Sequence, residues 1–132
     1  MSHITRLEIQ ITDLNALEHA CVSVGVELRL QQKTFRHYAN QRSACECAIV
    51  VPNNAQAFEI GLVRSPQNAD AYELRTDFWM GGYGLVQQVG ENAERLLQHY
   101  AAHMSVKQLM SEGYRVDMET DAEGNIFVYA EE

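Results

Sequence analysis

The sequence predicts an α+β fold, with a mostly antiparallel sheet of about six to seven strands and two main helices packed on one face. Most of the chain consists of short segments in which apolar and polar residues alternate, which is the period of a half-buried strand. Only two segments carry apolar residues at helical spacing, and each is inserted singly between groups of strands. That order favours α+β over a fold with regularly alternating strands and helices.

The first third of the chain predicts strand 5–11, helix 14–24 and strand 26–31. Both strands alternate apolar and polar residues. Asp13 is placed to cap the free amides at the start of the helix, and Gly25 is placed to end it.

The middle of the chain predicts three strands that form a meander. The first covers 44–51 and ends at the turn 52–54, whose sequence is Pro-Asn-Asn. The second covers 58–62, and the loop 65–68 separates it from the third, which covers 72–78.

The last third predicts one long helix followed by a hairpin. The glycine-rich segment 81–84 breaks the strand pattern and is interpreted as a turn. The helix covers 91–112 and ends before Gly113. Strands 115–120 and 126–130 then flank an acidic turn.

Size and composition predict one domain that covers residues 1–132. This length is typical of a single domain. With 46% apolar and 21% charged residues, the composition is close to the globular average. No segment approaches the ~20 apolar residues that a membrane helix needs. The N-terminal residues also lack the apolar core of a secretion signal, so a cytoplasmic protein without membrane contact is expected.

The charge of the chain is distributed unevenly. The net charge is −8, from 10 Lys and Arg residues and 18 Asp and Glu residues. Residues 1–64 hold six cations and six anions, whereas residues 65–132 hold four cations and twelve anions. Because a local field acts only over a Debye length of roughly 8 Å at physiological salt, a polyanion would have to bind in the first half.

Residues 33–42 gather cations and aromatic rings without any carboxylate, which makes this segment the candidate site for nucleic acid. Rings there would stack on unpaired bases, at ~1–3 kcal/mol per base, while cations meet phosphates. The alternative is a hairpin whose rings enter the core while its cations are solvated. The candidate binding residues are Lys33, Phe35, Arg36, His37, Tyr38 and Arg42.

Two residue pairs have the spacing of metal ligands. Cys45 and Cys47 would share one face of a strand, and His99 and His103 lie one helical turn apart. The zincin pattern is absent because Tyr100 occupies the position of its glutamate. The alternative is buried thiols and solvated imidazoles. No metal, cofactor or catalytic residue is expected, the three cysteines are expected to be reduced, and the chain is not expected to be an enzyme.

The C-terminal hairpin carries a strong negative charge that only Arg115 opposes. Its carboxylates are Asp117, Glu119, Asp121, Glu123, Glu131 and Glu132. They form either a solvated face or a contact for a basic partner, or they guard the basic segment. Phe127 and Tyr129 alternate with Ile126 and Val128, so both faces of the last strand are partly apolar. This predicts self-association, because the second face needs a cover.

Several segments of the chain resemble one family. They are residues 1–4, 58–63, 72–79, 113–116 and 123–126. These segments resemble the uncharacterised family of the hypothetical chloroplast reading frame thirty-five, which is found in plastids, cyanobacteria and some phages. The resemblance covers most of the chain in order. It supports the α+β fold and implies no activity.

The chain is also similar in kind to small acidic proteins of lytic phages, which bind single-stranded DNA as RNA polymerase cofactors. This similarity implies a phage protein that acts as an accessory factor in transcription by recruiting a polymerase. We therefore predict a non-enzymatic homo-oligomer that binds single-stranded DNA, or RNA, without strong sequence preference. The alternative is a protein-only adaptor or regulatory subunit of a motor ATPase or polymerase, which would use the acidic C-terminal half.

Overall fold

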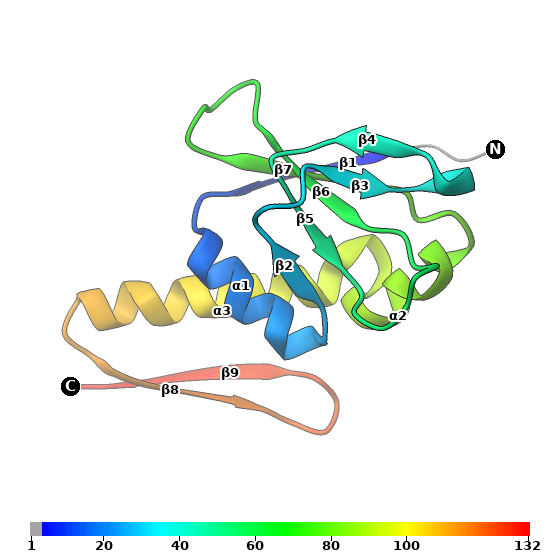
Figure 1. The fold of residues 1–132 in the computed structure, drawn as a ribbon. Helices are drawn as coiled ribbons and strands as arrows, with labels where there is room; N and C mark the ends of the chain where they lie inside the picture. Colours follow the sequence, from blue (N-terminus) through cyan, green and yellow to red (C-terminus); the bar gives the residue numbers. More distant parts are fainter. Residues whose placement is uncertain (1–3) are drawn as a thin grey trace.

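The computed structural model describes residues 4–132, apart from the side chain of Glu8, and has an α+β fold (Figure 1). Its centre is a five-stranded sheet with strand order β1-β7-β6-β5-β2. Every neighbouring pair in this sheet is antiparallel. The predicted fold class is therefore confirmed. The strands are β1 (Thr5–Ile11), β2 (Glu27–Arg29), β5 (Cys47–Val50), β6 (Ile60–Arg64) and β7 (Tyr72–Thr76).

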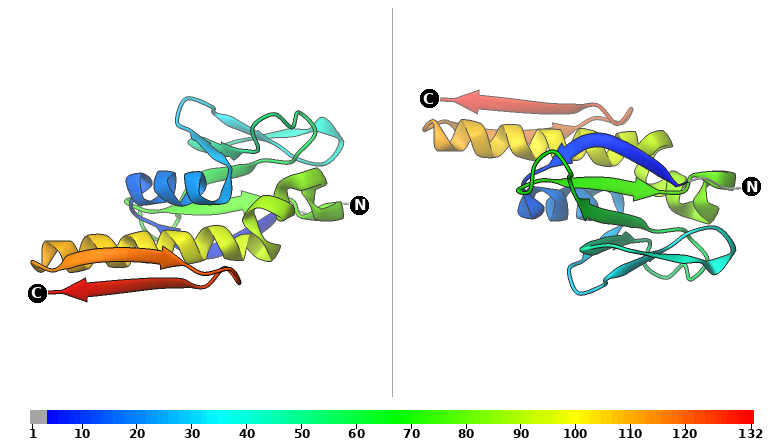
Figure 2. Two further views of the ribbon diagram at one scale, coloured as in Figure 1. Left: turned by 90° about the horizontal axis from the view of Figure 1, so that it is seen from below. Right: turned by 90° about the horizontal axis from the view of Figure 1, so that it is seen from above.

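The other strands form two separate two-stranded sheets instead of extending the central one. Strands β3 (Thr34–Arg36) and β4 (Arg42–Ala44) pair with each other, as do β8 (Arg115–Thr120) and β9 (Ile126–Glu131). The two small sheets lie on opposite sides of the molecule, and the long helix lies between the central sheet and β8–β9 (Figures 1 and 2). That helix prevents the hairpin from joining the sheet, so the single sheet is smaller than predicted.

The chain forms three α-helices within residues 4–132: α1 (Leu14–Val24), α2 (Leu85–Val89) and α3 (Glu94–Ser111). The predicted caps of the first helix are confirmed. Asp13 Oδ1 accepts a hydrogen bond from the Ala16 amide at 2.9 Å, and Gly25 ends the helix with φ 80°. No helix among the described residues is long and apolar enough to span a membrane.

The short helix α2 was not predicted from the sequence. Its five residues are too few to show helical periodicity, and Gly90 separates it from α3 with φ 86°. A Cβ atom at Gly90 would lie 3.0 Å from the Arg95 amide nitrogen, so this sharp connection requires glycine. A single helical turn, Glu91–Ala93, then leads into α3, which begins three residues later than predicted.

The main core lies between the central sheet and α1, α2 and α3. Alternate residues of the strands face the helices, which places both main helices on one face of the sheet, as predicted. Representative core side chains, each no more than 5% exposed, are Ile11, Leu17, Ile49, Leu62, Leu74, Leu96 and Tyr100. On the opposite face of the sheet, β3–β4 packs against β5 and β6, and it carries three of the six candidate nucleic-acid-binding residues, Phe35, Arg36 and Arg42.

Candidate nucleic-acid interface

Phe35 belongs to the core rather than to a binding surface. Its ring is 1% exposed and packs on Ala48 and Val50, on the face of the sheet opposite to the helices. Gly61 of β6 provides the space, because a Cβ atom there would lie 2.2 Å from Phe35 Cδ1. The expectation that Phe35 stacks on a base is therefore corrected, and the alternative of a core ring applies to it.

His37 is also buried. It is 7% exposed, and its Nε2 atom lies 2.9 Å from the Ser43 hydroxyl oxygen. Its ring centroid is 5.6 Å from that of Phe35. His37 thus closes the end of the small core under β3–β4, which corrects its expected role as a ligand contact.

Arg36 and Arg42 face each other across β3–β4 and share the buried carboxylate of Glu59. Arg36 Nη2 lies 3.8 Å from Glu59 Oε2, and Arg42 Nη1 lies 3.6 Å from Oε1. Oε1 also accepts hydrogen bonds from Gln32 Nε2 at 3.0 Å and from the Arg36 amide at 2.8 Å. Two guanidinium groups around one carboxylate leave one positive charge in excess at this position.

The two arginines differ in how accessible they are. The Arg36 side chain is 15% exposed and donates to the Ala57 carbonyl oxygen at 2.6 Å, so it mainly holds β3 on the sheet. The Arg42 side chain is 46% exposed. Arg29 is similarly exposed, and its Nε atom lies 3.0 Å from a Glu27 carboxylate oxygen. Arg42 and Arg29 are therefore the cations that can reach a ligand here.

A polar cleft of about 480 Å³ brings these groups together. Its cationic wall consists of Arg29, Arg36 and Arg42, and its other wall includes the loop residues Asn53 and Asn54. Lys33, the remaining cation of the predicted binding segment, is exposed and does not line the cleft. Among the residues that the structure describes, the Lys33 ammonium group donates to the backbone carbonyl oxygens of Leu30 at 3.4 Å and Glu46 at 2.7 Å and pairs with no carboxylate.

Tyr38 belongs to a cluster of aromatic rings beside the cleft. It is half-buried and lies edge-on to Trp79, with ring centroids 5.0 Å apart. Trp79 lies 6.1 Å from Tyr83, which in turn lies 5.2 Å from Phe58. Trp79 is 36% exposed and Tyr83 is 45% exposed. The exposed rings of the cluster are therefore Trp79 and Tyr83, which were not among the predicted binding residues, and the predicted residue Tyr38 is half-buried beside them.

The turn that presents Trp79 and Tyr83 has an unusual backbone. Four consecutive residues, Met80 to Tyr83, have φ between 52° and 66°, and two of them are not glycine. Left-handed backbone at non-glycine residues costs roughly 1–2 kcal/mol per residue. Hydrogen bonds from the Phe58 amide to the Gly82 carbonyl and from Asn54 Nδ2 to the Tyr83 carbonyl hold the turn in place. A glycine-rich sequence indicates a turn, but it does not reveal which rings the turn exposes.

The cleft and the rings are physically connected. Asn54 lines the cleft and donates to the Tyr83 carbonyl oxygen at 3.1 Å. Arg36 donates to the carbonyl oxygen of Ala57, and the ring of the next residue, Phe58, packs edge-on against the Tyr83 ring. We call this region the basic–aromatic surface, and it consists of Arg29, Arg36, Arg42, Asn54, Tyr38, Trp79 and Tyr83.

Comparison with known proteins places the chain in a family without assigning it an activity. Residues 20–128 match the family described as "Protein of unknown function (DUF1257)". The chain belongs to this family. No curated protein and no solved structure matches it. Because the matched residues of this DUF1257 protein include the whole basic–aromatic surface, that surface lies within the family domain.

The cysteine and histidine pairs do not form a metal site in the described part of this DUF1257 protein. No group of three or more His, Cys, Asp or Glu side chains within residues 4–132 is arranged to hold a metal ion. His103 instead stacks on His19 of α1, with ring centroids 5.4 Å apart. Burial raises the pKa of the Cys45 thiol to about 11, so it is protonated and weakly nucleophilic near neutral pH.

Proposed function

We propose that this DUF1257 protein binds single-stranded DNA or RNA on the basic–aromatic surface, without strong sequence preference. The observation that supports this is that Asn54, which lines a cleft with three guanidinium groups, hydrogen-bonds to the backbone of Tyr83, which belongs to a cluster of partly exposed rings. Rings stack on unpaired bases at ~1–3 kcal/mol per base, and guanidinium groups meet phosphates. Stacking reads no base edge, so sequence preference is expected to be weak. An accessory role in transcription, by recruiting a polymerase, follows the similarity to phage cofactors.

The affinity of the basic–aromatic surface for an oligonucleotide is expected to be modest, because carboxylates neutralise part of its positive charge. Glu59 neutralises part of the charge of Arg36 and Arg42, and Arg29 is paired with Glu27. We therefore expect about two to three phosphate contacts, which correspond to a slope of log K against log salt of roughly −1.4 to −2 for a single strand. The net charge of −8 opposes binding as well. Binding is thus expected to be clear at low salt and weak at physiological salt.

Fluorescence anisotropy with a labelled oligothymidine and a labelled duplex tests this proposal. Trp79→Ala with Tyr83→Ala should weaken single-strand binding by ~1–3 kcal/mol per lost base stack and leave the weaker duplex binding almost unchanged. Arg42→Gln should weaken both and make the salt slope shallower by about 0.7 for the single strand. Arg115→Gln is the matched control, because this arginine lies on the C-terminal hairpin and its side chain is 83% exposed.

A further variant should act in the opposite direction. Glu59→Gln removes the carboxylate that faces Arg36 and Arg42, so it should strengthen oligonucleotide binding at low salt. It should also lower the stability of the fold, because it removes the charge partner of a mostly buried guanidinium group. If the unsubstituted protein shows no binding at the lowest salt tested, the proposed function is wrong.

The rival function is a protein-only adaptor or regulatory subunit that acts through the acidic C-terminal half. It predicts that neither oligonucleotide binds and that the Trp79, Tyr83 and Arg42 variants change only stability. The same titrations therefore separate the two functions, and neither function requires an enzymatic step.

A further inference from the structure

The C-terminal hairpin leaves one edge of β9 without a partner strand. Within residues 4–132, β8 and β9 pair only with each other and form a sheet of their own. The hairpin lies along α3, on the side of that helix away from the central sheet (Figures 1 and 2). The amide and carbonyl groups along the outer edge of β9 therefore remain available to another extended segment.

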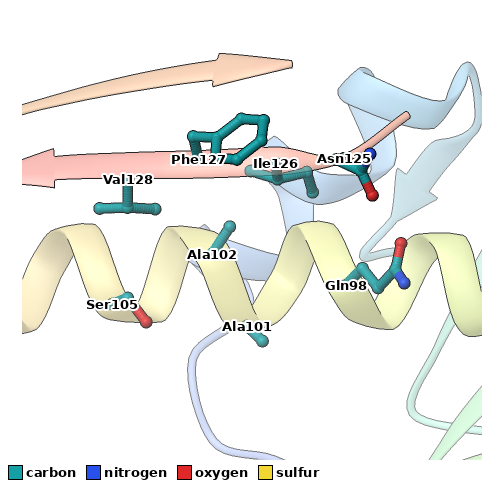
Figure 3. Close-up of a pocket in the computed structure, with 8 residues that line it drawn as sticks. All are labelled: Gln98, Ala101, Ala102, Ser105, Asn125, Ile126, Phe127 and Val128. Atoms are coloured by element: carbon teal, nitrogen blue, oxygen red, sulfur yellow. The ribbon is translucent and has the colours of Figure 1, made fainter. Parts of the chain in front are cut away.

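A groove of about 520 Å³ runs between β9 and α3 (Figure 3). Small side chains, including Ala101, Ala102 and Ser105, form its helical wall and leave the helix backbone close to the groove. Ile126 and Val128 point from β9 toward α3 and form the opposite wall (Figure 3). The remaining lining includes the uncharged polar residues Gln98 and Asn125, and no charged residue among those that the structure describes lines the groove.

The outer face of the hairpin places carboxylates beside aromatic rings. Glu119 is paired across the strands with Phe127, and Asp117 with Tyr129. The two rings stack 6.4 Å apart and are 44% and 50% exposed. A ring face attracts a cation, and a neighbouring carboxylate adds a charge-assisted hydrogen bond. This face therefore fits Lys or Arg side chains.

Along β9, the side chains that face the groove alternate with the aromatic side chains of the outer face, as is usual for a strand. Successive side chains of a strand point to opposite sides, so a segment added to the edge of β9 would send alternate side chains into the groove. The intervening side chains would lie beside Phe127, Tyr129 and their carboxylates. We propose that the edge of β9 binds an extended segment of another protein in which apolar residues alternate with Lys or Arg.

Charge decides between this partner and a second copy of the chain. The hairpin carries six carboxylates against Arg115, and Arg115 is already paired with Glu131 at 3.3 Å. Pairing two β9 edges would bring two such sets of carboxylates close together, where salt screens them only beyond about 8 Å. The homo-oligomer expected from the sequence is therefore disfavoured at this edge, whereas a cationic strand is attracted to it.

A set of capped fluorescent peptides tests the proposal on the unsubstituted protein. The first alternates Val and Lys, the second has the same composition with its Val and Lys residues in two blocks, and the third alternates Val and Glu. We expect the alternating Val–Lys peptide to bind at least about tenfold more tightly than the block peptide, and the Val–Glu peptide not to bind. Methylating the backbone nitrogens of the Val–Lys peptide that face β9 should abolish binding, because it removes the strand hydrogen bonds.

Protein variants locate the binding site. Asp117→Lys with Glu119→Lys should weaken binding of the Val–Lys peptide at least about tenfold and create binding of the Val–Glu peptide. Ala101→Leu, on the exposed side of α3, should weaken binding by filling the groove. Glu18→Lys is the control, because it reverses one carboxylate charge on the exposed surface of α1, away from the hairpin, and should have no effect.

Two results would overturn the proposal. The first is equal binding of the alternating and block peptides, which would indicate attraction by charge alone. The second is self-association in sedimentation that strengthens as salt is added, which would assign the edge to a second copy. If a variant fails to fold by circular dichroism, the methylated peptide still decides the question on the unsubstituted protein.

Discussion

At the scale of single residues, Gly61 determines that Phe35 lies in the core. Phe35 and Gly61 come from different sheets and are far apart in sequence, and a Cβ atom at Gly61 would overlap the ring. Alternation along residues 33–42 shows that a ring and several cations are present, but not that a glycine elsewhere opens a site for the ring. The burial of Phe35 therefore could not be deduced from its own segment.

The pair can be tested by a double-mutant cycle. Gly61→Ala should destabilise the fold by ~1–3 kcal/mol, because a methyl group 2.2 Å from Phe35 Cδ1 forces the ring to move. Phe35→Ala should cost ~3–5 kcal/mol, as for buried aromatic residues generally. The double variant should lose clearly less than the sum, because the space left by the ring accepts the methyl group. Urea unfolding provides the four free energies, and additive losses would contradict the contact.

The histidines of α3 predict a dependence of stability on pH. Burial lowers the pKa of His99 and of His103 below the ordinary value, and His19 and His99 lower that of His103 further. The unfolded chain therefore binds protons near its pKa of about 6.5, where the folded chain does not, so stability falls as pH drops through that value. Urea unfolding between about pH 8 and pH 5.5 should show this loss. His99→Gln with His103→Gln should flatten it, and an unchanged slope in that variant would assign the effect to other groups.

At the scale of elements, the sequence predicts those features that depend on neighbouring residues, such as the two ends of the first helix. The first helix ends where Asp13 and Gly25 indicate, because caps act within a single turn. The strands β8 and β9 were predicted at 115–120 and 126–130, whereas β3 lies in a segment for which no strand was predicted, and alternation does not specify which strand pairs with which. The division into three sheets depends on tertiary packing, namely on α3 separating the hairpin from the central sheet.

In the candidate site, too, local patterns identify residues of one segment but not those that tertiary packing brings beside them. Arg36, Arg42 and Tyr38 were identified from their own segment, and all three lie on the basic–aromatic surface. Trp79 and Tyr83 could not be identified, because a left-handed turn of four residues presents them and two of those residues are not glycine. Such a turn is stable only because Asn54 and Phe58, which are distant in sequence, hydrogen-bond to it.

At the scale of the whole molecule, the two proposed binding surfaces are separated. The basic–aromatic surface includes Arg36 and Arg42 of β3–β4, and the acidic hairpin lies beyond α3, on the opposite side of the molecule from β3–β4 (Figures 1 and 2). A nucleic acid and a basic protein segment would therefore contact different sides of the chain. This arrangement favours a bridging role over a competition between the two ligands.

The separation predicts how the hairpin influences oligonucleotide binding. Asp117→Asn with Glu119→Gln removes two negative charges on the outer face of the hairpin. At low salt, where the Debye length is about 30 Å, the lost repulsion should strengthen oligothymidine binding. At physiological salt, where that length is about 8 Å, the affinity should not change, because β3–β4 and the hairpin lie on opposite sides of the molecule and salt screens the charges between them. Anisotropy titrations of both proteins at the two salt concentrations measure the difference. Stronger binding that persisted at physiological salt would mean that the hairpin guards the basic–aromatic surface by direct contact, and the bridging role would then be wrong.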